Sequence, residues 1–204
     1  MTAKPKAKYI SPEEYLAMER EALEKHEYYN GEIFLMSGAK RNHVYICSNI
    51  LVSLAPCLKD QNCRIAASDL RVHIPTTGLY TYPDVTIVCG GDEFLSDGHF
   101  DTLLNPKVII EVLSPSTESY DRGAKFDHYK TIDSLKEYVL VWQDKKRAAR
   151  YTRRDDDSWV LTDLIGDDAA IELVSVGCSL SMNDIYDRIE FDEHPQTEGS
   201  REIN

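Results

Sequence analysis

The chain of 204 residues has no apolar run as long as the roughly 18 residues that a membrane-spanning helix needs. Its N-terminal segment, residues 1–8, is basic, but it leads into polar sequence and not into the apolar stretch of a secretory signal. These absences argue against a membrane span and against secretion. We therefore expect a cytoplasmic protein with no membrane contact.

Cysteine is also scarce and irregularly placed. The chain has five cysteines, an odd number, at positions 47, 57, 63, 89 and 178, and no Cys-x-x-Cys pair occurs. Metal-binding cysteines and disulfide frameworks usually show regular spacing. The pattern therefore predicts reduced thiols in a reducing compartment, with neither zinc nor disulfides.

Positive charge is in short supply. Lysine and arginine number 23 against 35 acidic residues, which gives a net charge of −12. This balance opposes general, charge-driven binding of nucleic acid, which needs a basic face. One basic stretch, residues 145–154, stands apart and is followed by three aspartates at 155–157. It is interpreted either as a solvated hairpin neutralised by these aspartates or as an edge that contacts phosphates.

The length suggests one domain. We expect a flexible N-terminus over residues 1–10, a single domain over 11–190 and a disordered acidic tail over 191–204. A loop rich in turn formers is expected over 90–101. Periodicity, caps and turn residues predict the following elements: a helix over 11–25, a β-hairpin over 27–35, a helix over 40–58, strands at 63–67, 70–75, 80–89 and 107–113, a helix over 118–132, a strand at 138–142, a hairpin over 148–165, a strand at 170–174 and a helical turn over 181–186. This order predicts an α/β (α+β) fold with a mixed sheet flanked by helices.

The strand at 107–113 contains the most informative residue of the chain. It is a short run of β-branched and apolar residues of the kind that is buried on both faces, yet it contains Glu111. Burying a carboxylate costs several kcal/mol unless a cation or hydrogen bonds compensate. The partner of Glu111 is therefore either a structural cation such as Arg71 or Arg122, or a functional one.

A second acid, Asp84, opens the apolar half of the 80–89 strand. It either ends a turn after Pro83 or joins Glu111 to form a metal site. Mg²⁺ prefers hard oxygen ligands, and the carbonyl of Val112 could add a third oxygen to the two carboxylates. Such a site could activate water for phosphodiester hydrolysis.

Hydrolytic sites of this kind also use a lysine. Residues i and i+2 of a strand share a face, so the natural position after Glu111 is 113, but Leu113 occupies it. The helix that follows offers Lys125 first and Lys130 second. Lys125 could instead form a solvated surface pair with Asp121, four residues earlier.

Several short motifs occur in a fixed order along the chain. They are His26-Glu27, Asn30-Gly31-Glu32, His43, Pro83-Asp84, Glu111-Val112-Leu113-Ser114-Pro115-Ser116, Asp121-Arg122-Gly123-Ala124-Lys125, Glu137-Tyr138 and Val141-Trp142. This set resembles the Uma2 family of restriction-endonuclease-like proteins, within the PD-(D/E)xK nuclease superfamily, over residues 10–190. The resemblance implies a restriction-endonuclease-like core.

The resemblance also implies roles for individual residues. Asp84 and Glu111 would hold the metal, Lys125 would be the catalytic lysine moved from the strand onto the helix, and Glu27 would be an additional acid. From the residues alone, Glu27 could instead pair with His26 or a lysine. His43 is at this stage better explained as a capping or core residue.

Together these observations predict a Mg²⁺-dependent DNA endonuclease, with Mn²⁺ able to substitute. Two alternatives remain open: a non-catalytic binding protein on the same fold, and an assembly protein. A homodimer is expected, and an apolar edge strand at 138–142 is one way for two copies to pair.

Overall fold

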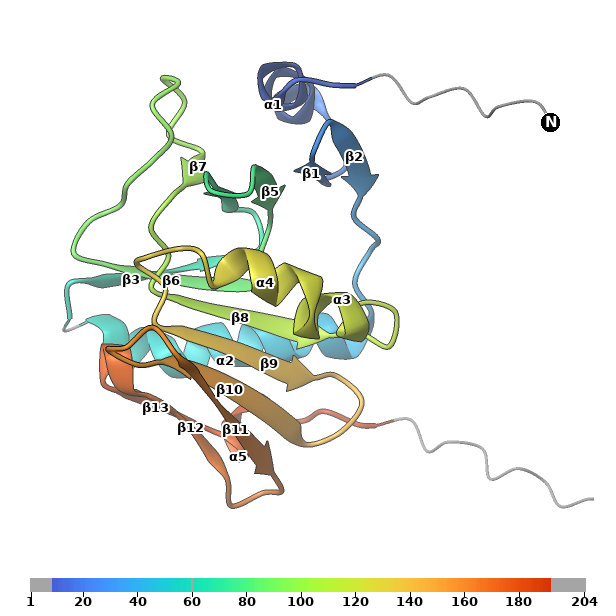
Figure 1. Cartoon of the computed structure of the whole chain (residues 1–204). Helices are drawn as coiled ribbons and strands as arrows, with labels where there is room; N and C mark the ends of the chain where they lie inside the picture. Colours follow the sequence, from blue (N-terminus) through green and yellow to red (C-terminus); the bar gives the residue numbers. More distant parts are fainter. Residues whose placement is uncertain (1–8, 60, 192–204) are drawn as a thin grey trace, which may run out of the picture.

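The computed structural model describes residues 9–59 and 61–191. The expected flexible N-terminus and acidic tail therefore fall almost wholly outside the described residues. Figure 1 shows the elements in order: α1 (Pro12–Glu21), β1 (His26–Tyr29), β2 (Glu32–Leu35), α2 (Arg41–Lys59), β3 (Cys63–Ala67), β4 (Arg71–Ile74), β5 (Leu79–Thr81), β6 (Val85–Cys89), β7 (Thr102–Leu103), β8 (Val108–Leu113), α3 (Glu118–Arg122), α4 (Ala124–Tyr129), β9 (Glu137–Trp142), β10 (Arg147–Arg153), β11 (Trp159–Ile165), β12 (Ala170–Leu173), a 3₁₀ turn η1 (Val174–Val176), β13 (Cys178–Ser181) and α5 (Met182–Ile185).

The larger sheet has six strands in the order β11-β10-β9-β8-β6-β3. β8 and β9 are parallel and are joined by α3 and α4, whereas the other neighbours pair antiparallel. The sheet is therefore mixed, as the sequence predicts. All six residues of β8 are buried, so the strand lies in the centre of the molecule.

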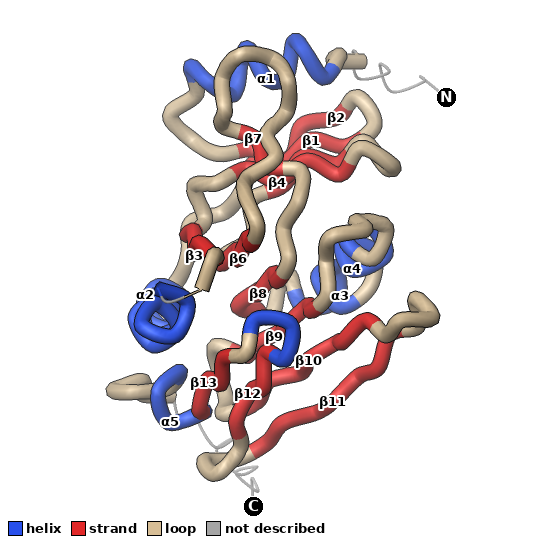
Figure 2. The backbone as a smooth tube through the Cα atoms, turned by 90° about the vertical axis from the view of Figure 1, so that its left-hand side faces the viewer, coloured by secondary structure: helices blue, strands red, loops and turns tan. Residues whose placement is uncertain are grey.

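Alternation along β8 assigns its side chains to two cores. Val108, Ile110 and Val112 pack with the buried face of α2. Ile109 and Leu113 pack with Tyr129 of α4 and with β9. Figure 2 shows the resulting layers, with α2 on one side of β8 and α3 and α4 on the other. Glu111 alternates with Val112 and so belongs to the side of α4.

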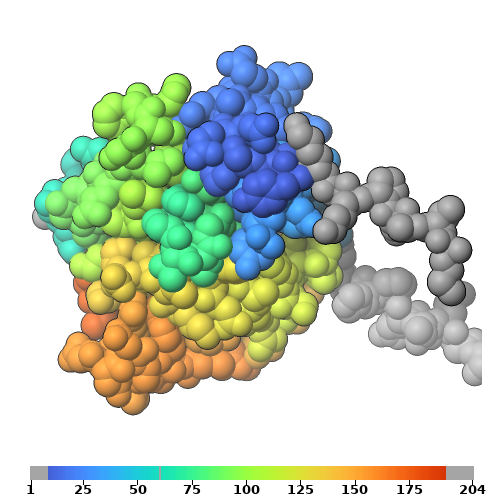
Figure 3. All heavy atoms as spheres, turned by 45° about the horizontal axis from the view of Figure 1, so that its top comes forward, coloured from blue at the N-terminus to red at the C-terminus, as the bar shows by residue number. Residues whose placement is uncertain are grey.

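The smaller sheet has the strand order β2-β1-β5-β4-β7 and packs against α1. Tyr15 of α1 stacks on Tyr28 of β1 and packs against Tyr80 of β5. Arg20 of α1 binds Asp97 and Asp101 of the loop before β7 at 2.5 and 2.8 Å. The space-filling view shows this loop, in light green, beside the blue region that contains α1 (Figure 3). These contacts hold the β1–β2 hairpin in place.

Local signals explain where these elements start. Ser11 caps α1 and forms a capping box with Glu14, and Pro12 occupies the first turn, as predicted. Asn30 and Gly31 adopt positive φ values of 50° and 86° between β1 and β2. That is the geometry that an Asn-Gly hairpin turn provides.

Some boundaries differ from the prediction. The predicted 118–132 helix ends at Tyr129 and is broken at Gly123, whose φ of −116° and ψ of −99° are not helical. The predicted 80–89 strand is interrupted over residues 82–84, where Pro83 cannot donate to a ladder. The first helix ends at Glu21, four residues early.

The prediction of an edge strand at 138–142 is wrong. β9 pairs with β8 on one side and with β10 on the other. Its apolar character reflects burial on both faces, so it cannot pair across a dimer axis. The homodimer itself stays a prediction.

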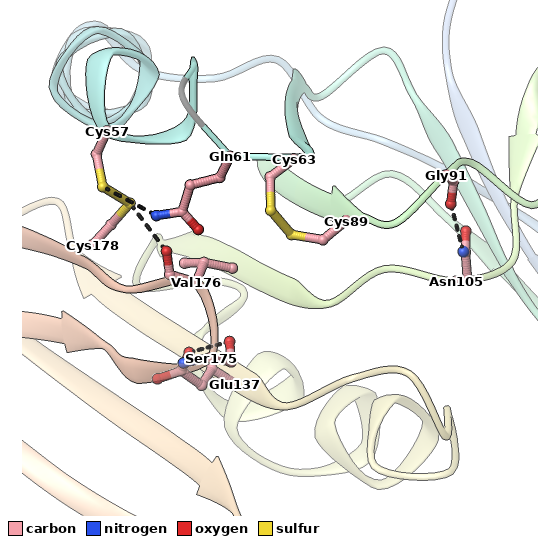
Figure 4. Close-up of a disulfide and its surroundings, with 10 residues drawn as sticks. All are labelled: Cys57, Gln61, Cys63, Cys89, Gly91, Asn105, Glu137, Ser175, Val176 and Cys178. Atoms are coloured by element: carbon pink, nitrogen blue, oxygen red, sulfur yellow. Dashed lines mark hydrogen bonds between the residues drawn. A yellow bond between two sulfur atoms is a disulfide. The ribbon is translucent and has the colours of Figure 1, made fainter.

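The cysteines are also not all reduced. Cys57 of α2 is bonded to Cys178 of β13, and Cys63 is bonded to Cys89, its direct partner between β3 and β6 (Figure 4). Only Cys47 is free. The sequence spacing of the cysteines does not reveal these pairs, because the tertiary fold brings together residues that are 121 and 26 positions apart. Among the described residues, no helix is long and apolar enough to cross a membrane.

Candidate active site

A cleft of about 770 Å³ opens beside the β1–β2 hairpin, the start of α2 and the segment after β8. Its lining includes all four acids and bases singled out from the sequence: Glu27, Asp84, Glu111 and Lys125. They come from β1, the residue before β6, β8 and α4. The fold therefore brings together residues that are far apart in the sequence.

Strand pairing places Asp84 beside Glu111. Val85 is opposite Ile110, so Asp84 continues the ladder next to Glu111. Asp84 Oδ2 accepts a hydrogen bond of 2.7 Å from the Val112 amide, and the Asp84 amide points to Glu111 Oε2 at 3.4 Å. The contact of Val112 with Asp84 is thus through its amide. The role expected for the Val112 carbonyl stays a prediction.

Lys125 lies among three carboxylates. Its Nζ is 2.9 Å from Glu111 Oε1, 3.3 Å from Glu27 Oε1 and 3.5 Å from Asp121 Oδ1. The side chain is only 7% exposed. It is therefore not a solvated helix residue, and the ammonium that faces Glu111 comes from α4 and from neither Arg71 nor Arg122.

The carboxylates outnumber the cation, and their pKa values reflect this. Burial raises the pKa of Glu111 to about 8; Asp84 and Asp121 add to the rise, and Lys125 opposes it. Burial also raises the pKa of Asp121. Burial by itself would lower the pKa of Lys125, but Glu111 and the other acids raise it well above its usual value, so the lysine stays charged.

Two hydroxyl groups orient the acids. Tyr129 donates a hydrogen bond of 2.9 Å to Glu111 Oε1, and its own pKa is well above the usual value because it is buried. Thr81 donates to Glu27 Oε1. Of the two alternative partners for Glu27, His26 is engaged elsewhere, because its Nδ1 is 2.9 Å from Glu19 Oε2, and the lysine is Lys125 itself. Glu111 Oε2 keeps only the long contact with the Asp84 amide.

The donor set fits Mg²⁺. Glu27, Asp84, Glu111 and Asp121 supply only hard oxygen atoms, which this ion prefers. Four acids face one ammonium here; burial raises the pKa of Glu111, and Asp84 and Asp121 raise it further, so the site can accept more positive charge. A divalent cation held by Asp84 and Glu111 would supply it.

The sequence alone misjudged two residues of the cleft. His43 is neither a cap nor a core residue, since its Nε2 lies 2.9 Å from Asp84 Oδ1. The spacing predicts a surface pair of Asp121 with Lys125, yet Asp121 is 5% exposed. Its i,i+4 spacing to the lysine was the available signal, but spacing does not reveal burial.

Other charged candidates lie elsewhere. Lys130, the second choice for the catalytic lysine, pairs with Asp127 at 2.5 Å, and both side chains are exposed.

In the basic 145–154 stretch, Arg147 pairs with Asp163 at 2.7 Å and Arg153 with Asp157 at 2.9 Å. The stretch contributes nothing to the lining of the cleft. These contacts favour the solvated hairpin over a phosphate-contacting edge.

Comparison with known proteins identifies the family of the chain. A family model described as "Putative restriction endonuclease", named Uma2, matches residues 12–183. The chain belongs to the Uma2 family. The match includes every residue of the candidate site, from Glu27 to Lys125.

Two curated relatives of this Uma2 chain are from Synechocystis sp. (strain ATCC 27184 / PCC 6803 / Kazusa). "Uncharacterized protein slr1290" is 37% identical over 182 residues, which is 89% of this chain and 94% of the relative. "Uncharacterized protein sll1609" is 36% identical over 165 residues, 81% of this chain and 93% of the relative.

A solved structure shares the fold. It is from Anabaena variabilis ATCC 29413 and is described as a "putative nuclease belonging to DUF820". The TM-score is 0.69 at 19% identity, covering 87% of this chain and 97% of the other. The Uma2 chain therefore has a nuclease-like fold, in agreement with the restriction-endonuclease-like core expected from the sequence.

Proposed function

We propose that this protein is a Mg²⁺-dependent DNA endonuclease, with Mn²⁺ able to replace Mg²⁺. The observation that carries the proposal is the contact of Lys125 with Glu111, beside Asp84, in a cleft of a Uma2 chain. Two neighbouring carboxylates, one on β8 and one just before β6, together with a lysine can support metal-assisted phosphodiester hydrolysis. The family and the fold support a nuclease, and the proposal adds the metal dependence and the DNA substrate.

Mg²⁺ bound by Asp84 and Glu111 would neutralise the scissile phosphate and lower the pKa of a bound water. The residues around it have separate tasks. Glu111 Oε2 and Asp84 present the oxygen ligands, while Tyr129 fixes the other oxygen of Glu111. Lys125 holds a positive charge at the site, where it can orient a water or stabilise charge that develops on the phosphate.

Glu27 and Asp121 act on Lys125. Both carboxylates lie within 3.5 Å of its Nζ, so they fix the position of the ammonium and keep it protonated. His43 similarly holds Asp84 through Oδ1. We therefore assign positioning roles to Glu27, Asp121 and His43.

The strongly acidic composition is compatible with a DNA substrate. A phosphate that reaches the carboxylates must be bridged by a cation, because like charges would otherwise repel it. Binding of DNA should therefore depend on the divalent ion and not on a basic face. Ser114, Ser116 and Thr117 also line the cleft and offer hydroxyl donors to a phosphate.

The test is incubation of the full-length protein with supercoiled plasmid and with linear single-stranded DNA in Mg²⁺, Mn²⁺ or EDTA. We expect nicking or linearisation with either cation and none in EDTA. Asp84→Asn and Glu111→Gln should each lower the cleavage rate by at least about a hundredfold, a loss typical of a lost electrostatic catalytic group. Asp127→Asn, an exposed acid on α4, is the matched control and should cleave normally.

Isothermal calorimetry measures the binding of Mg²⁺ and Mn²⁺, and this measurement decides how an absence of cleavage is interpreted. Cleavage that persists in Glu111→Gln would contradict the assignment. Neither cleavage nor metal binding would favour the non-catalytic binding protein. Metal binding that is lost in Glu111→Gln, without cleavage of these substrates, would support the metal site and contradict the choice of DNA substrate.

A further inference from the structure

One wall of the cleft carries three side chains of different metal-ligating types. His43 and Cys47 lie one turn apart on α2, so they share a face of that helix. Asp84 faces them from the residue before β6. One ligand atom from each residue lies within 4.8 Å of the others, and His43 Nε2 is 2.9 Å from Asp84 Oδ1.

These distances are close to those of a metal centre. Zn²⁺ binds thiolate sulfur at about 2.3 Å and imidazole nitrogen or carboxylate oxygen at about 2.0–2.2 Å, in tetrahedral geometry. Two ligand atoms of such a centre are then roughly 3.3–3.8 Å apart. Small side-chain movements would bring the three atoms onto one ion, and all three residues line the cleft.

The ligand types differ from those of the Mg²⁺ site. Nitrogen and sulfur suit Zn²⁺ and similar transition ions, whereas Mg²⁺ binds oxygen and avoids thiolate. Cys47 is also the one cysteine that the two disulfides leave free. The other four sulfur atoms cannot compete for an ion while their disulfides are intact.

The thiol needs a cation to ionise. Burial raises the pKa of Cys47, and the negative charges of Asp84 and Glu111 raise it further. A coordinating metal deprotonates such a thiol outright. The S–H proton passes to solvent as the sulfur–metal bond forms, and no oxidant or reductant is involved.

We propose that His43, Cys47 and Asp84 form a second cation site, selective for Zn²⁺ and similar thiolate-binding ions. Because Asp84 belongs to both sites, an ion held by this trio takes a carboxylate that the Mg²⁺ site uses. Zn²⁺ should therefore inhibit Mg²⁺-dependent cleavage. This consequence rests on the proposed nuclease function, but binding at the trio does not.

Co²⁺ is the probe for binding, because cobalt–thiolate bonds absorb in the near ultraviolet and Zn²⁺ itself is spectroscopically silent. The full-length protein is titrated without reductant, so that the disulfides remain. We expect one equivalent of Co²⁺ to produce the thiolate band and Zn²⁺ to remove it. Cys47→Ser should abolish the band.

The other variants separate the two sites. His43→Gln and Asp84→Asn should weaken Co²⁺ binding by more than the roughly 10–100-fold that loss of an outer-shell partner costs. Glu111→Gln should retain the band, because Glu111 is not a ligand of the trio. His128→Gln is the matched histidine control, since His128 lies on α4 and outside the lining of the cleft, and it should bind Co²⁺ normally.

A second measurement needs no variant. Zn²⁺ should slow alkylation of Cys47 by iodoacetamide, measured by mass spectrometry of the wild-type protein, whereas Mg²⁺ should not. Absence of a thiolate band, a band that persists in Cys47→Ser, or alkylation unaffected by Zn²⁺ would each overturn the proposal. None of these readouts depends on cleavage, so failure of this site and failure of the nuclease assignment are distinguishable.

Discussion

Lys125 Nζ lies 2.9 Å from Glu111 Oε1, and the side chains of both residues are buried. The lysine comes from the crossover after β8 and not from β8 itself. Position 113, where a strand lysine would share the face of Glu111, is filled by Leu113, which packs in the core with Tyr129. The ammonium of Lys125 lies at the Glu111 carboxylate instead, and it is carried there by α4, which follows the break at Gly123.

Removal of the lysine charge should destabilise the protein. Lys125→Met leaves Glu27, Glu111 and Asp121 buried without their cation, and breaking a buried pair in this way costs about 3–5 kcal/mol. We expect that loss in urea unfolding at pH 8 in EDTA, and a smaller loss at pH 5, where the acids can take up protons. Lys130→Met removes an exposed lysine from the same region and should change stability by less than about 0.5 kcal/mol. Equal losses in the two variants would contradict the buried cluster.

Metal affinity should rise with pH. Burial raises the pKa of Glu111 to about 8, so below that pH a bound ion must displace a proton from this carboxyl. We expect the Mg²⁺ affinity measured by calorimetry to rise by up to about tenfold per pH unit below pH 8 and to level off above it. Buffers of different ionisation enthalpy should report proton release at pH 7. A flat affinity from pH 6 to 9 would mean that Glu111 is not a ligand.

Stability of the metal-free protein should change with pH in the opposite sense. An unfolded glutamate has its pKa near 4.5, whereas that of folded Glu111 is about 8. The folded state therefore binds more protons between these values, so this group's contribution to stability is full below pH 4.5 and is lost as pH rises to 8. Urea unfolding in EDTA should show the decline in the wild type. In Glu111→Gln the decline should be weaker, because the glutamine does not titrate.

The central strand and its acid were predictable because both signals are local. Val108–Leu113 is apolar except for Glu111, and this pattern predicts the burial that all six residues show. The proximity of Asp84 and Glu111 was predictable as well, since strands that are close in sequence tend to pair. Lys125 follows from the same local pattern: Leu113 fills the strand position, so the next lysines are on the helix that follows, which in the structure crosses back to the parallel β9.

The rest of the site depends on tertiary contacts. His43 reaches Asp84 only because α2 packs on the face of β6 and β8 opposite to α4. Asp121 is buried, and its carbonyl accepts a hydrogen bond of 3.0 Å from the Tyr138 hydroxyl on β9. The disulfide from Cys57 to Cys178 joins α2 to β13 and has no counterpart in sequence spacing.

A buried acid outside the cleft should matter for folding alone. Glu137 is fully buried at the start of β9 and accepts hydrogen bonds from the amides of Val174 and Ser175 at 3.0 and 3.1 Å. Glu137→Gln places an amide NH₂ against these donors, so we expect a loss of about 2–3 kcal/mol in urea unfolding. Mg²⁺ binding should be kept under conditions where the variant is folded. The exposed Glu172→Gln is the control and should be neutral within about 0.5 kcal/mol.

The two disulfides should contribute unequally to stability. A cross-link restricts the unfolded chain more when it closes a longer loop. Cys57–Cys178 spans 121 residues and Cys63–Cys89 spans 26. Replacing the first pair by alanines should therefore cost about 5 kcal/mol and replacing the second about 3.5 kcal/mol, measured by urea unfolding without reductant. Thiol titration of the denatured wild type should find one free thiol, and Cys47→Ala should have none. Five free thiols, or a wild-type unfolding midpoint that reductant does not lower, would contradict the cross-links.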